Sequence, residues 1–466
     1  MRTISKLYLD FDSFFATAEQ HFNPALRDRA VGVVPLDSPH TSCIAISGQA
    51  KARGLRSGAS VKEARSKIPD MLFVVARHDV YVRLHHRILE TVEACLPIED
   101  VRSIDELVCH LLPGQAADGA ALGERIKSAL SQQFSEVLTC SIGMASTELL
   151  AKIAAERYKP DGLCVLFDED LPEALADLPL RKLPGISDGI ERRLNLANIH
   201  TFEALWRLGP TQCRTIWRNI EGERFWNELH GKTVERPETQ KRMFGHSRIL
   251  PGDWRSKEKV AMCARQLCLS AARRLRRTQW RATRLSLSFK GDGASLSTHD
   301  LPARKLPMHD LSMHNKSIRK NNSKLRWKEE LPFAPARDDH TFLQALSQGL
   351  TRSEESLTFK PRSVHVTLHG LVDTASMTHD LFDTHTTEAG SRTTEQDRLK
   401  WEQLSDVMDS LRANFGPQAI SLGPREEMPG GYVGAKIAFG RIPDDADFDQ
   451  APVADEDTQF CLTINS

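Results

Sequence analysis

The sequence of 466 residues contains no run of about eighteen apolar residues that could cross a membrane. Charged residues interrupt segment 1–12, so it does not resemble a signal peptide. We therefore expect a cytoplasmic protein with no membrane partner. No Cys-x-x-Cys pair is present and the nine cysteines are scattered, which favours reduced thiols over a zinc site or a disulfide framework. No internal repeat is found, and the length predicts about three domains.

The sequence also lacks net charge, because 62 Lys and Arg balance 62 Asp and Glu. A neutral average argues against a large polyanionic partner. The charges are segregated, however: segment 442–466 carries seven acidic residues and no Lys or Arg, whereas segment 254–290 carries eleven basic residues and one acidic residue. This segregation keeps nucleic acid as a candidate partner.

Two carboxylates and two aromatic rings follow the first strand-like segment. Residues 6–11 alternate as a strand and helical spacing begins at Ser13, so Asp10 and Asp12 lie at a strand-to-helix junction. A second acidic pair, Asp105 and Glu106, lies between two short apolar runs. We predict that the two stretches form one carboxylate cluster. For any single Asp, a helix cap or a solvated turn is the alternative.

The first 170 residues combine strands and helices. Further strands are predicted at 31–34, 42–46, 101–104, 107–112 and 138–142. Helices are predicted at 59–68, 80–94, 120–134 and 146–157, the last with a serine N-cap. This order predicts an α+β domain with helices packed on one face of a sheet.

Residues 171–231 change to short helices punctuated by Pro and Gly. Within them, Leu183-Pro184-Gly185-Ile186-Ser187 resembles a helix-hairpin-helix turn. Such a turn exposes backbone N–H groups at a helix start, and these can bind a backbone phosphate. An ordinary helix–helix turn is the alternative. The polar stretch that follows predicts a linker.

The remaining residues predict a second α+β domain. Its strands are expected at 243–250, 282–290, 326–333, 363–372 and 435–439, and its helices at 256–277, 341–350 and 395–415. Polar insertions at 292–325 and 375–392 and an acidic tail at 442–466 are expected to be disordered or mobile. The basic residues expected to contact DNA phosphates are Arg273, Arg274, Arg277 and Arg284. A solvated helix end is the alternative.

The acidic residues lack accompanying His or Cys ligands, and carboxylate oxygens of this kind favour Mg²⁺ or Mn²⁺ over zinc. Asp10, Asp105 and Glu106, with the Phe11 carbonyl as a backbone ligand, could hold two ions. Two such ions activate the attacking oxygen and stabilise the leaving group in displacement at phosphorus. The sequence therefore predicts a two-metal phosphoryl-transfer site.

An ordered set of motifs resembles the Y-family DNA polymerases, the translesion class, and most closely their DinB and UmuC branches. The motifs are Asp-Phe-Asp-Ser-Phe-Phe-Ala at 10–16, Ser-Ile-Asp-Glu at 103–106, the segment 141–162 ending in Lys-Pro-Asp-Gly, Pro-Gly-Ile at 184–186, and Phe-Gly-His-Ser at 244–247. The resemblance implies a multidomain α+β right-hand polymerase. Its parts would be a palm with an antiparallel sheet (1–10 and 77–168), small fingers (11–76), a helical thumb (169–231), a linker (232–242), a little finger (243–441) and the tail.

The resemblance also implies the activity and the residues that perform it. The protein would add dNMP to a primer 3′-hydroxyl on damaged templates, with two Mg²⁺ or Mn²⁺ ions and no proofreading exonuclease. Asp10 and Asp105 would bind both ions and Glu106 the catalytic one. Phe15 would be the steric gate that rejects a 2′-hydroxyl, with Phe14 packed beside it. Lys51 and Lys159 would reach the triphosphate.

Two positions depart from the family pattern. Gly48 stands where the family usually has Tyr, and Lys51 stands where it usually has Arg. Lysine lacks the planar fork that binds phosphate oxygens in pairs. We therefore expect weaker nucleotide binding, unless Arg53 compensates.

These departures leave room for a second hypothesis, a catalytically weak or inactive polymerase-like adaptor that binds DNA or the sliding clamp. The intact carboxylates argue against it. A nucleotide cyclase is a third alternative. The expected partners are primer-template DNA, dNTP and the sliding clamp, the last through Gln459-Phe460-Cys461-Leu462. The protein is expected to act as a monomer at the bacterial nucleoid.

Overall fold

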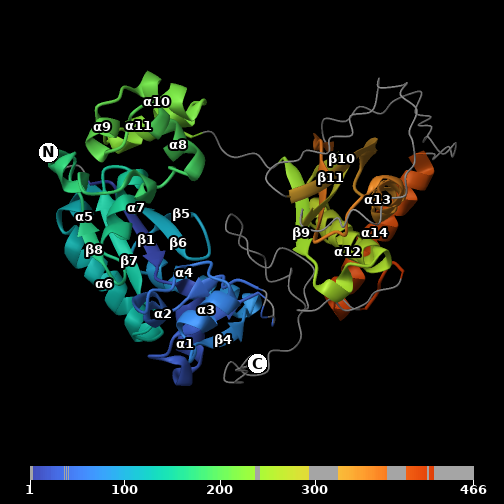
Figure 1. Cartoon of the computed structure of the whole chain (residues 1–466), viewed down its shortest axis with the longest axis horizontal. Coiled ribbons are helices and arrows are strands. Elements are labelled where there is room, and N and C mark those ends of the chain that lie inside the picture. The colour runs from blue at the N-terminus through green and yellow to red at the C-terminus, as the bar shows by residue number, and fades with distance from the viewer. Residues whose placement is uncertain are drawn as a thin grey trace. The chain divides into compact units, whose positions relative to one another are not determined.

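The computed structural model of the protein describes residues 4–35, 37, 39, 41–236, 242–292, 324–374, 395–416 and 419–423. The chain divides into two compact units between residues 238 and 239, within the predicted linker (Figure 1). No helix in the described part of the chain is long and apolar enough to span a membrane. The predicted insertions lie almost entirely outside the described residues, and the strand at 435–439 and the acidic tail lie wholly outside them.

The first unit is built on a five-stranded sheet in the order β5-β6-β1-β7-β8. The strands are β1 (Lys6–Phe11), β5 (Ile98–Val101), β6 (Glu106–His110), β7 (Cys140–Ala145) and β8 (Leu163–Val165). Neighbouring strands are antiparallel except β7 and β8, which are parallel. The predicted antiparallel sheet is therefore mixed at one edge, because a parallel pair needs a crossover connection and α7 (Glu148–Arg157) provides it.

Helices cover both faces of this sheet, so the prediction that they pack on one face was wrong. On one face Leu7, Leu9 and Phe11 pack against α4 (His78–Glu93) and α6 (Gly119–Gln133). On the other face Tyr8 packs in a core with residues of α7. Successive side chains of a strand point to opposite faces, so β1 contributes to both cores.

Helix α7 starts one residue later than a cap at Ser146 would place it. Its N-cap is Thr147, whose hydroxyl accepts a hydrogen bond from the Leu150 amide at 3.3 Å. The Ser146 hydroxyl instead donates to Asp168 at 2.5 Å. Thr and Ser are both good N-caps, so the sequence alone did not separate them.

The rest of the first unit consists of a small sheet and short helices. The sheet has the order β3-β2-β4 and comprises β2 (Val31–Val34), β3 (Ala45–Ile46) and β4 (Leu72–Val75). Besides α4, the helices of the first 118 residues are α1 (Phe14–Phe22), α2 (Gly48–Ala52), α3 (Val61–Lys67) and α5 (Pro113–Ala117). The later ones are α8 (Asp188–Leu196), α9 (Phe202–Trp206), α10 (Pro210–Trp217) and α11 (Glu221–Leu229).

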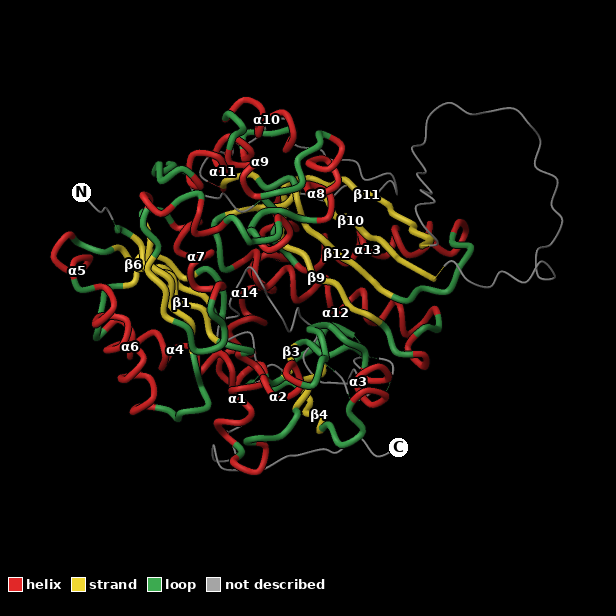
Figure 2. Tube along the Cα trace, turned by 60° about the vertical axis from the view of Figure 1, so that its left-hand side comes forward, coloured by secondary structure: helices red, strands yellow, loops and turns green. Residues whose placement is uncertain are grey.

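The second unit has a four-stranded antiparallel sheet in the order β11-β10-β12-β9 (Figure 2). Its elements are β9 (Met243–Ile249), α12 (Lys257–Arg276), β10 (Trp280–Asp292), β11 (Lys324–Ala336), α13 (Asp339–Ser356), β12 (Ser363–His369), β13 (Val372–Asp373) and α14 (Glu395–Phe415). The predicted helices and the four long strands are confirmed. One sheet face buries Leu285, Leu287 and Phe289 against α12 and α13, and the opposite face is polar.

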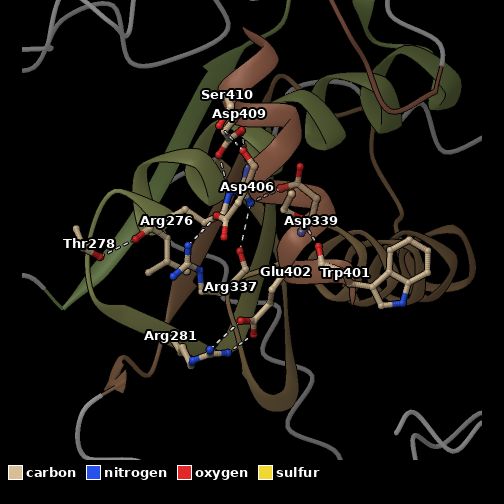
Figure 3. A network of polar contacts seen from close by, with 12 residues as sticks. Arg276, Thr278, Arg281, Arg337, Asp339, Trp401, Glu402, Asp406, Asp409 and Ser410 are labelled. Carbon is tan, nitrogen blue, oxygen red and sulfur yellow. Dashed lines mark hydrogen bonds and ion pairs between the residues drawn. The ribbon is translucent and has the colours of Figure 1, made fainter. Parts of the chain in front are cut away.

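Helix α14 is attached to this unit largely through charged side chains (Figure 3). Arg276 of α12 donates to Asp409 of α14 at 2.7 and 3.0 Å and to Asp339 at 2.6 Å. Arg281 pairs with Glu402, and Arg337 pairs with Asp406. Burying a charge is costly unless it is paired, so this network fixes the position of α14.

Candidate active site

The two acidic stretches meet because β1 and β6 are adjacent antiparallel strands. Their register places Asp10 directly opposite Glu106. Asp105 immediately precedes β6, and its carbonyl accepts a hydrogen bond from the Phe11 amide at 2.9 Å. Phe11, the predicted backbone ligand, is the last residue of β1. All four predicted metal-binding residues therefore lie at one end of the sheet.

The turn that carries Asp105 is held from several sides. The Ser103 hydroxyl donates to the Asp105 carboxylate at 2.5 Å. The carbonyl of Ile104 lies 2.8 Å from Nδ1 of His85, a buried residue of α4. The amides of Arg102 and Ser103 both donate to the Glu106 carbonyl, at 2.9 and 3.1 Å. The carboxylates therefore lie on a rigid turn.

Burial and neighbouring charges together set the pKa values of this cluster. Burial raises the pKa of Asp10, although the ammonium of Lys159, 2.5 Å from its Oδ1, acts in the opposite direction. Burial and the neighbouring Glu106 also raise the pKa of Asp105. For Glu106, burial is outweighed by the hydrogen bond and charge of Lys152, so its pKa is lowered. Three acidic groups thus share a space in which the two lysines neutralise part of their charge.

The donor set suits a hard divalent cation. Carboxylate oxygens and a backbone carbonyl are the ligands that Mg²⁺ and Mn²⁺ prefer. Within the described ranges, no group of three or more His, Cys, Asp or Glu is already arranged as a metal cage. Lys159 lies 2.5 Å from Asp10, and Lys152 lies 2.6 Å from Glu106. The residues fit the ion by charge and by their convergence on one end of the sheet.

Asp12 has a different environment from Asp10. Its carboxylate accepts hydrogen bonds from the Thr139 hydroxyl at 3.0 Å, the Ser141 hydroxyl at 2.9 Å and the Asp161 amide at 2.7 Å. These contacts tie the end of β1 to β7 and to the loop before β8. Asp12 is a structural carboxylate.

Phe14 and Phe15 lie in the first turn of α1 and are buried. The ring of Phe15 contacts Tyr81 at a centroid distance of 4.9 Å, and Phe14 contacts Phe11 at 5.8 Å. The Tyr81 hydroxyl donates to Glu19 at 2.6 Å. The sequence analysis did not identify Glu19 as the hydrogen-bond partner of Tyr81. Its position one helical turn after Phe15 could have indicated that the two side chains lie on the same side of α1.

Helix α2 presents the residues that depart from the family pattern. Lys51 is exposed in its last turn. A Cβ added to Gly48 would meet nothing within 4 Å, so the glycine is not required by crowding. Arg53 makes two hydrogen bonds to Asp70, at 2.9 and 2.7 Å. This ion pair is exposed and therefore weak, so compensation by Arg53 stays a prediction.

The predicted helix-hairpin-helix turn leads directly into α8. Gly185 has φ of +88°, a conformation that favours glycine. Ile186 is buried in the core, and its carbonyl accepts a hydrogen bond from Arg181 at 2.9 Å. Ser187 is the N-cap of α8 and makes no side-chain cap bond. The side chain of Ile186 therefore serves packing, and any phosphate contact here falls to the backbone.

The predicted DNA-binding arginines of the second unit have unequal access to solvent. Arg273 is partly buried, and burial lowers its pKa. Arg274 donates to the Gly245 carbonyl at 2.8 Å. Arg277 and Arg284 are exposed, and Arg284 projects from the polar face of the sheet. Of the four, the last two are placed to meet an external phosphate.

Sequence reasoning missed further basic residues on that polar face. Lys290 on β10 and Arg326 and Lys328 on β11 are exposed. Lys290 pairs in register with Arg326, and Ser288 with Lys328. Strand alternation with the buried Leu285, Leu287 and Phe289 was the signal that could have found them.

Comparison with known proteins gives a consistent result. A model described as the impB/mucB/samB family matches residues 9–156, and the model of that family's C-terminal domain matches residues 241–381. A DNA polymerase IV of Moorella thermoacetica is 31% identical over 294 residues, which cover 61% of this chain and 73% of the relative. A DNA polymerase IV of Pelotomaculum thermopropionicum is 31% identical over 296 residues, covering 61% and 72%.

Among solved structures, a Y-family DNA polymerase chimera is similar with a TM-score of 0.59. It is 19% identical in sequence, and the match covers 79% of this chain and 99% of that chain. At this identity the likeness shows a shared fold.

Proposed function

We propose that the carboxylates at the end of β1 and the start of β6 form the catalytic site of this chain, which belongs to the impB/mucB/samB family of Y-family DNA polymerases. The protein is a DNA-directed DNA polymerase of the translesion type, and such polymerases depend on divalent metal ions. The register that sets Asp10 opposite Glu106 carries the proposal. No observation favours a non-catalytic adaptor.

We assign Asp10 and Asp105 to both metal ions, Glu106 to the catalytic ion and the Phe11 carbonyl to an assisting contact. Two Mg²⁺ ions, or Mn²⁺ in their place, would activate the primer 3′-hydroxyl and stabilise the departing pyrophosphate. Ser103 orients the Asp105 carboxylate through its 2.5 Å hydrogen bond.

The nucleotide contacts follow from the same arrangement. Lys159 lies 2.5 Å from Asp10 and 2.9 Å from Glu156, which holds its ammonium beside the metal carboxylates, and we assign it to the triphosphate. Lys51, exposed on α2, is the second candidate for that role. Phe15 is assigned as the steric gate, and the ring of Tyr81 packs against it at a centroid distance of 4.9 Å.

The remaining assignments concern the domains and the partners. The five-stranded sheet is proposed as the palm, the three-stranded sheet with α2 and α3 as the fingers, the helices of 169–231 as the thumb and the second unit as the little finger. The polymerase would act as a monomer on primer-template DNA at the nucleoid. Docking on the sliding clamp would use Gln459–Leu462, which lies outside the described residues.

Primer extension tests the catalytic assignment. The Asp105→Asn, Glu106→Gln double variant should lose at least a hundredfold of the extension rate of the wild type with Mg²⁺ or Mn²⁺, an effect on the order of that expected when charge stabilisation in the transition state is removed. Lys6→Met is the matched control, because Lys6 lies in the same sheet and pairs with Glu99 at 2.5 Å, away from the carboxylates. Equal rates for the double variant and the wild type would exclude these carboxylates as the catalytic site.

A further inference from the structure

One face of α7 carries alternating charges at helical spacing. Glu148, Lys152 and Glu156 are four residues apart, so they lie along a single stripe of the helix. Each member contacts a different part of the acidic site. Glu148 accepts two hydrogen bonds from Arg102, at 2.6 and 2.5 Å, in the turn that precedes Asp105. Glu156 pairs with Lys159, which in turn contacts Asp10.

The middle member, Lys152, contacts a proposed metal ligand directly. Its Nζ lies 2.6 Å from Oε1 of Glu106 and 3.0 Å from the hydroxyl of Tyr8. The same ammonium lies 5.0 Å from the centroid of the Tyr8 ring, within the range of a cation–π contact. Lys152 is therefore fixed by three separate contacts.

Tyr8 adds to this arrangement from β1. It is two residues before Asp10, so both side chains point to the face of the sheet that α7 covers. Tyr8 is 2% exposed, and its hydroxyl accepts a hydrogen bond from the Lys152 ammonium at 3.0 Å. The Lys152 ammonium thus donates to the Tyr8 hydroxyl and to the Glu106 carboxylate at the same time.

The distance between α7 and the sheet is set by Gly143 on β7. A Cβ at this position would lie 2.0 Å from the carbonyl oxygen of Ala151 and 2.2 Å from the amide nitrogen of Ala155. The helix backbone thus rests directly on the strand next to β1. The distance that the Lys152 side chain spans to Glu106 is therefore set by backbone packing as well as by the ion pair.

We propose that Lys152 is a positioning residue which, together with Tyr8, holds the Glu106 carboxylate in the orientation needed to complete the catalytic metal site. This inference rests on the proposed function of Glu106 as a metal ligand. Groups that orient a metal ligand from behind commonly change metal affinity or activity by about 10- to 100-fold when they are removed. A lysine that served only as a structural ion pair would change stability instead.

Metal binding without turnover separates these two roles. Mn²⁺ affinity is measured by calorimetry on the full chain bound to a dideoxy-terminated primer-template and the next dNTP. Lys152→Met should weaken Mn²⁺ binding by about 10- to 100-fold. Lys152→Arg, which keeps the charge, should recover part of this loss, and Tyr8→Phe should show a smaller loss. Lys6→Met is the control, because it makes the same substitution in a Lys–Glu ion pair with a similar N···O distance in the same sheet. It should bind Mn²⁺ like the wild type.

The Mg²⁺ dependence of primer extension gives a second readout. Lys152→Met should raise the Mg²⁺ concentration for half-maximal rate by a factor similar to its loss of Mn²⁺ affinity. The KM for dNTP at saturating Mg²⁺ should stay close to that of the wild type, because Lys152 is assigned no contact with the triphosphate. Thermal unfolding of each variant verifies that it is folded.

The outcomes separate a failure of this inference from a failure of the proposed function of Glu106 as a metal ligand. If Glu106→Gln leaves Mn²⁺ affinity unchanged, the metal site itself is misassigned. If Glu106→Gln weakens Mn²⁺ binding and Lys152→Met does not, only the positioning role of Lys152 is overturned. The same holds if Lys152→Met lowers the thermal midpoint while its Mn²⁺ affinity equals that of the wild type.

Discussion

At the scale of single residues, neighbours rather than residue type decide what each carboxylate does. Asp10 and Asp12 are two positions apart and both are buried. Asp10 meets another carboxylate and a lysine, so its negative charge is only partly compensated. Asp12 meets two hydroxyls and an amide, all of which can donate a hydrogen bond. The first environment favours a cation, and the second is already satisfied.

The variant Asp12→Ala tests this difference. It removes the acceptor of three hydrogen bonds, one of them from the Asp161 amide, which cannot rotate to another partner. Leaving buried donors unsatisfied should lower the free energy of unfolding by about 2–4 kcal/mol, measured by urea denaturation. Mn²⁺ affinity of the folded variant should remain close to that of the wild type. A large loss of Mn²⁺ affinity with unchanged stability would make Asp12 a ligand.

At the scale of secondary-structure elements, the turn between β5 and β6 depends on α4. His85 of α4 is buried, and its Nδ1 holds the Ile104 carbonyl in the turn that presents Asp105. Its Nε2 is also buried and has no hydrogen-bond partner among the described residues. A proton added to the ring would therefore lie in an unsolvated position. Burial accordingly lowers the pKa of His85 to about 4.

This lowered pKa predicts acid sensitivity of the fold. The folded protein takes up the proton at a lower pH than the unfolded chain does, so the stabilising effect is complete above pH ~6.5 and is lost as the pH falls toward 4. The loss contributed by His85 is on the order of 3 kcal/mol. In His85→Gln, which keeps a donor but does not titrate, the free energy of unfolding should depend less on pH across this window.

Urea denaturation at pH 7 and at pH 4.5 provides the measurement. His110→Gln is the matched control, because His110 is exposed at the end of β6. The pH dependence of unfolding in His85→Gln is compared with that in His110→Gln, because the other titratable groups of the protein are present in both variants. Parallel pH profiles for wild type and His85→Gln would rule out this role for His85.

The sequence predicted these elements better than it predicted which surfaces they bury. Apolar spacing located α12 and α14 within two residues of their bounds. It did not show that Arg276 is buried between Asp339 and Asp409, which lie 63 and 133 residues away. A paired charge gives no apolar signal, and its partner is known only from the tertiary structure. For the same reason Arg273 and Arg274 were expected on the surface.

One face of β1 was misjudged for a related reason. The prediction that helices pack on one face of the sheet left the face that carries Tyr8 and Asp10 without a packing partner. In the fold they face α7, where Lys152 contacts Tyr8, and Lys159, just after the helix, contacts Asp10. The candidate carboxylates themselves could be found from sequence, because two acidic stretches next to strand patterns can converge at a sheet end. Lys152, which contacts Glu106, could not, since helical spacing does not show what a helix packs against.

At the scale of the whole molecule, zero net charge hides a positive surface on the second unit. The polar face of its sheet carries Arg284, Lys290, Arg326 and Lys328, while Glu330 on the same face pairs with Lys328 at 2.6 Å. Serines and a threonine lie between the basic residues in the register of β10 and β12. Such a face can bind backbone phosphates without reading bases, which suits a polymerase that follows any template.

The salt dependence of DNA binding measures this surface. Arg284→Ala, Lys290→Ala and Arg326→Ala combined should weaken primer-template binding and lower the slope of log K against log salt by about 0.9 for each phosphate that is no longer neutralised. Arg352→Ala serves as the control, because Arg352 pairs with Glu329 on the helix-covered side. Fluorescence anisotropy over a salt series gives both slopes. A triple variant with the wild-type slope would place the DNA on another surface, and Arg277 at the end of α12 would then be the next basic residue to test.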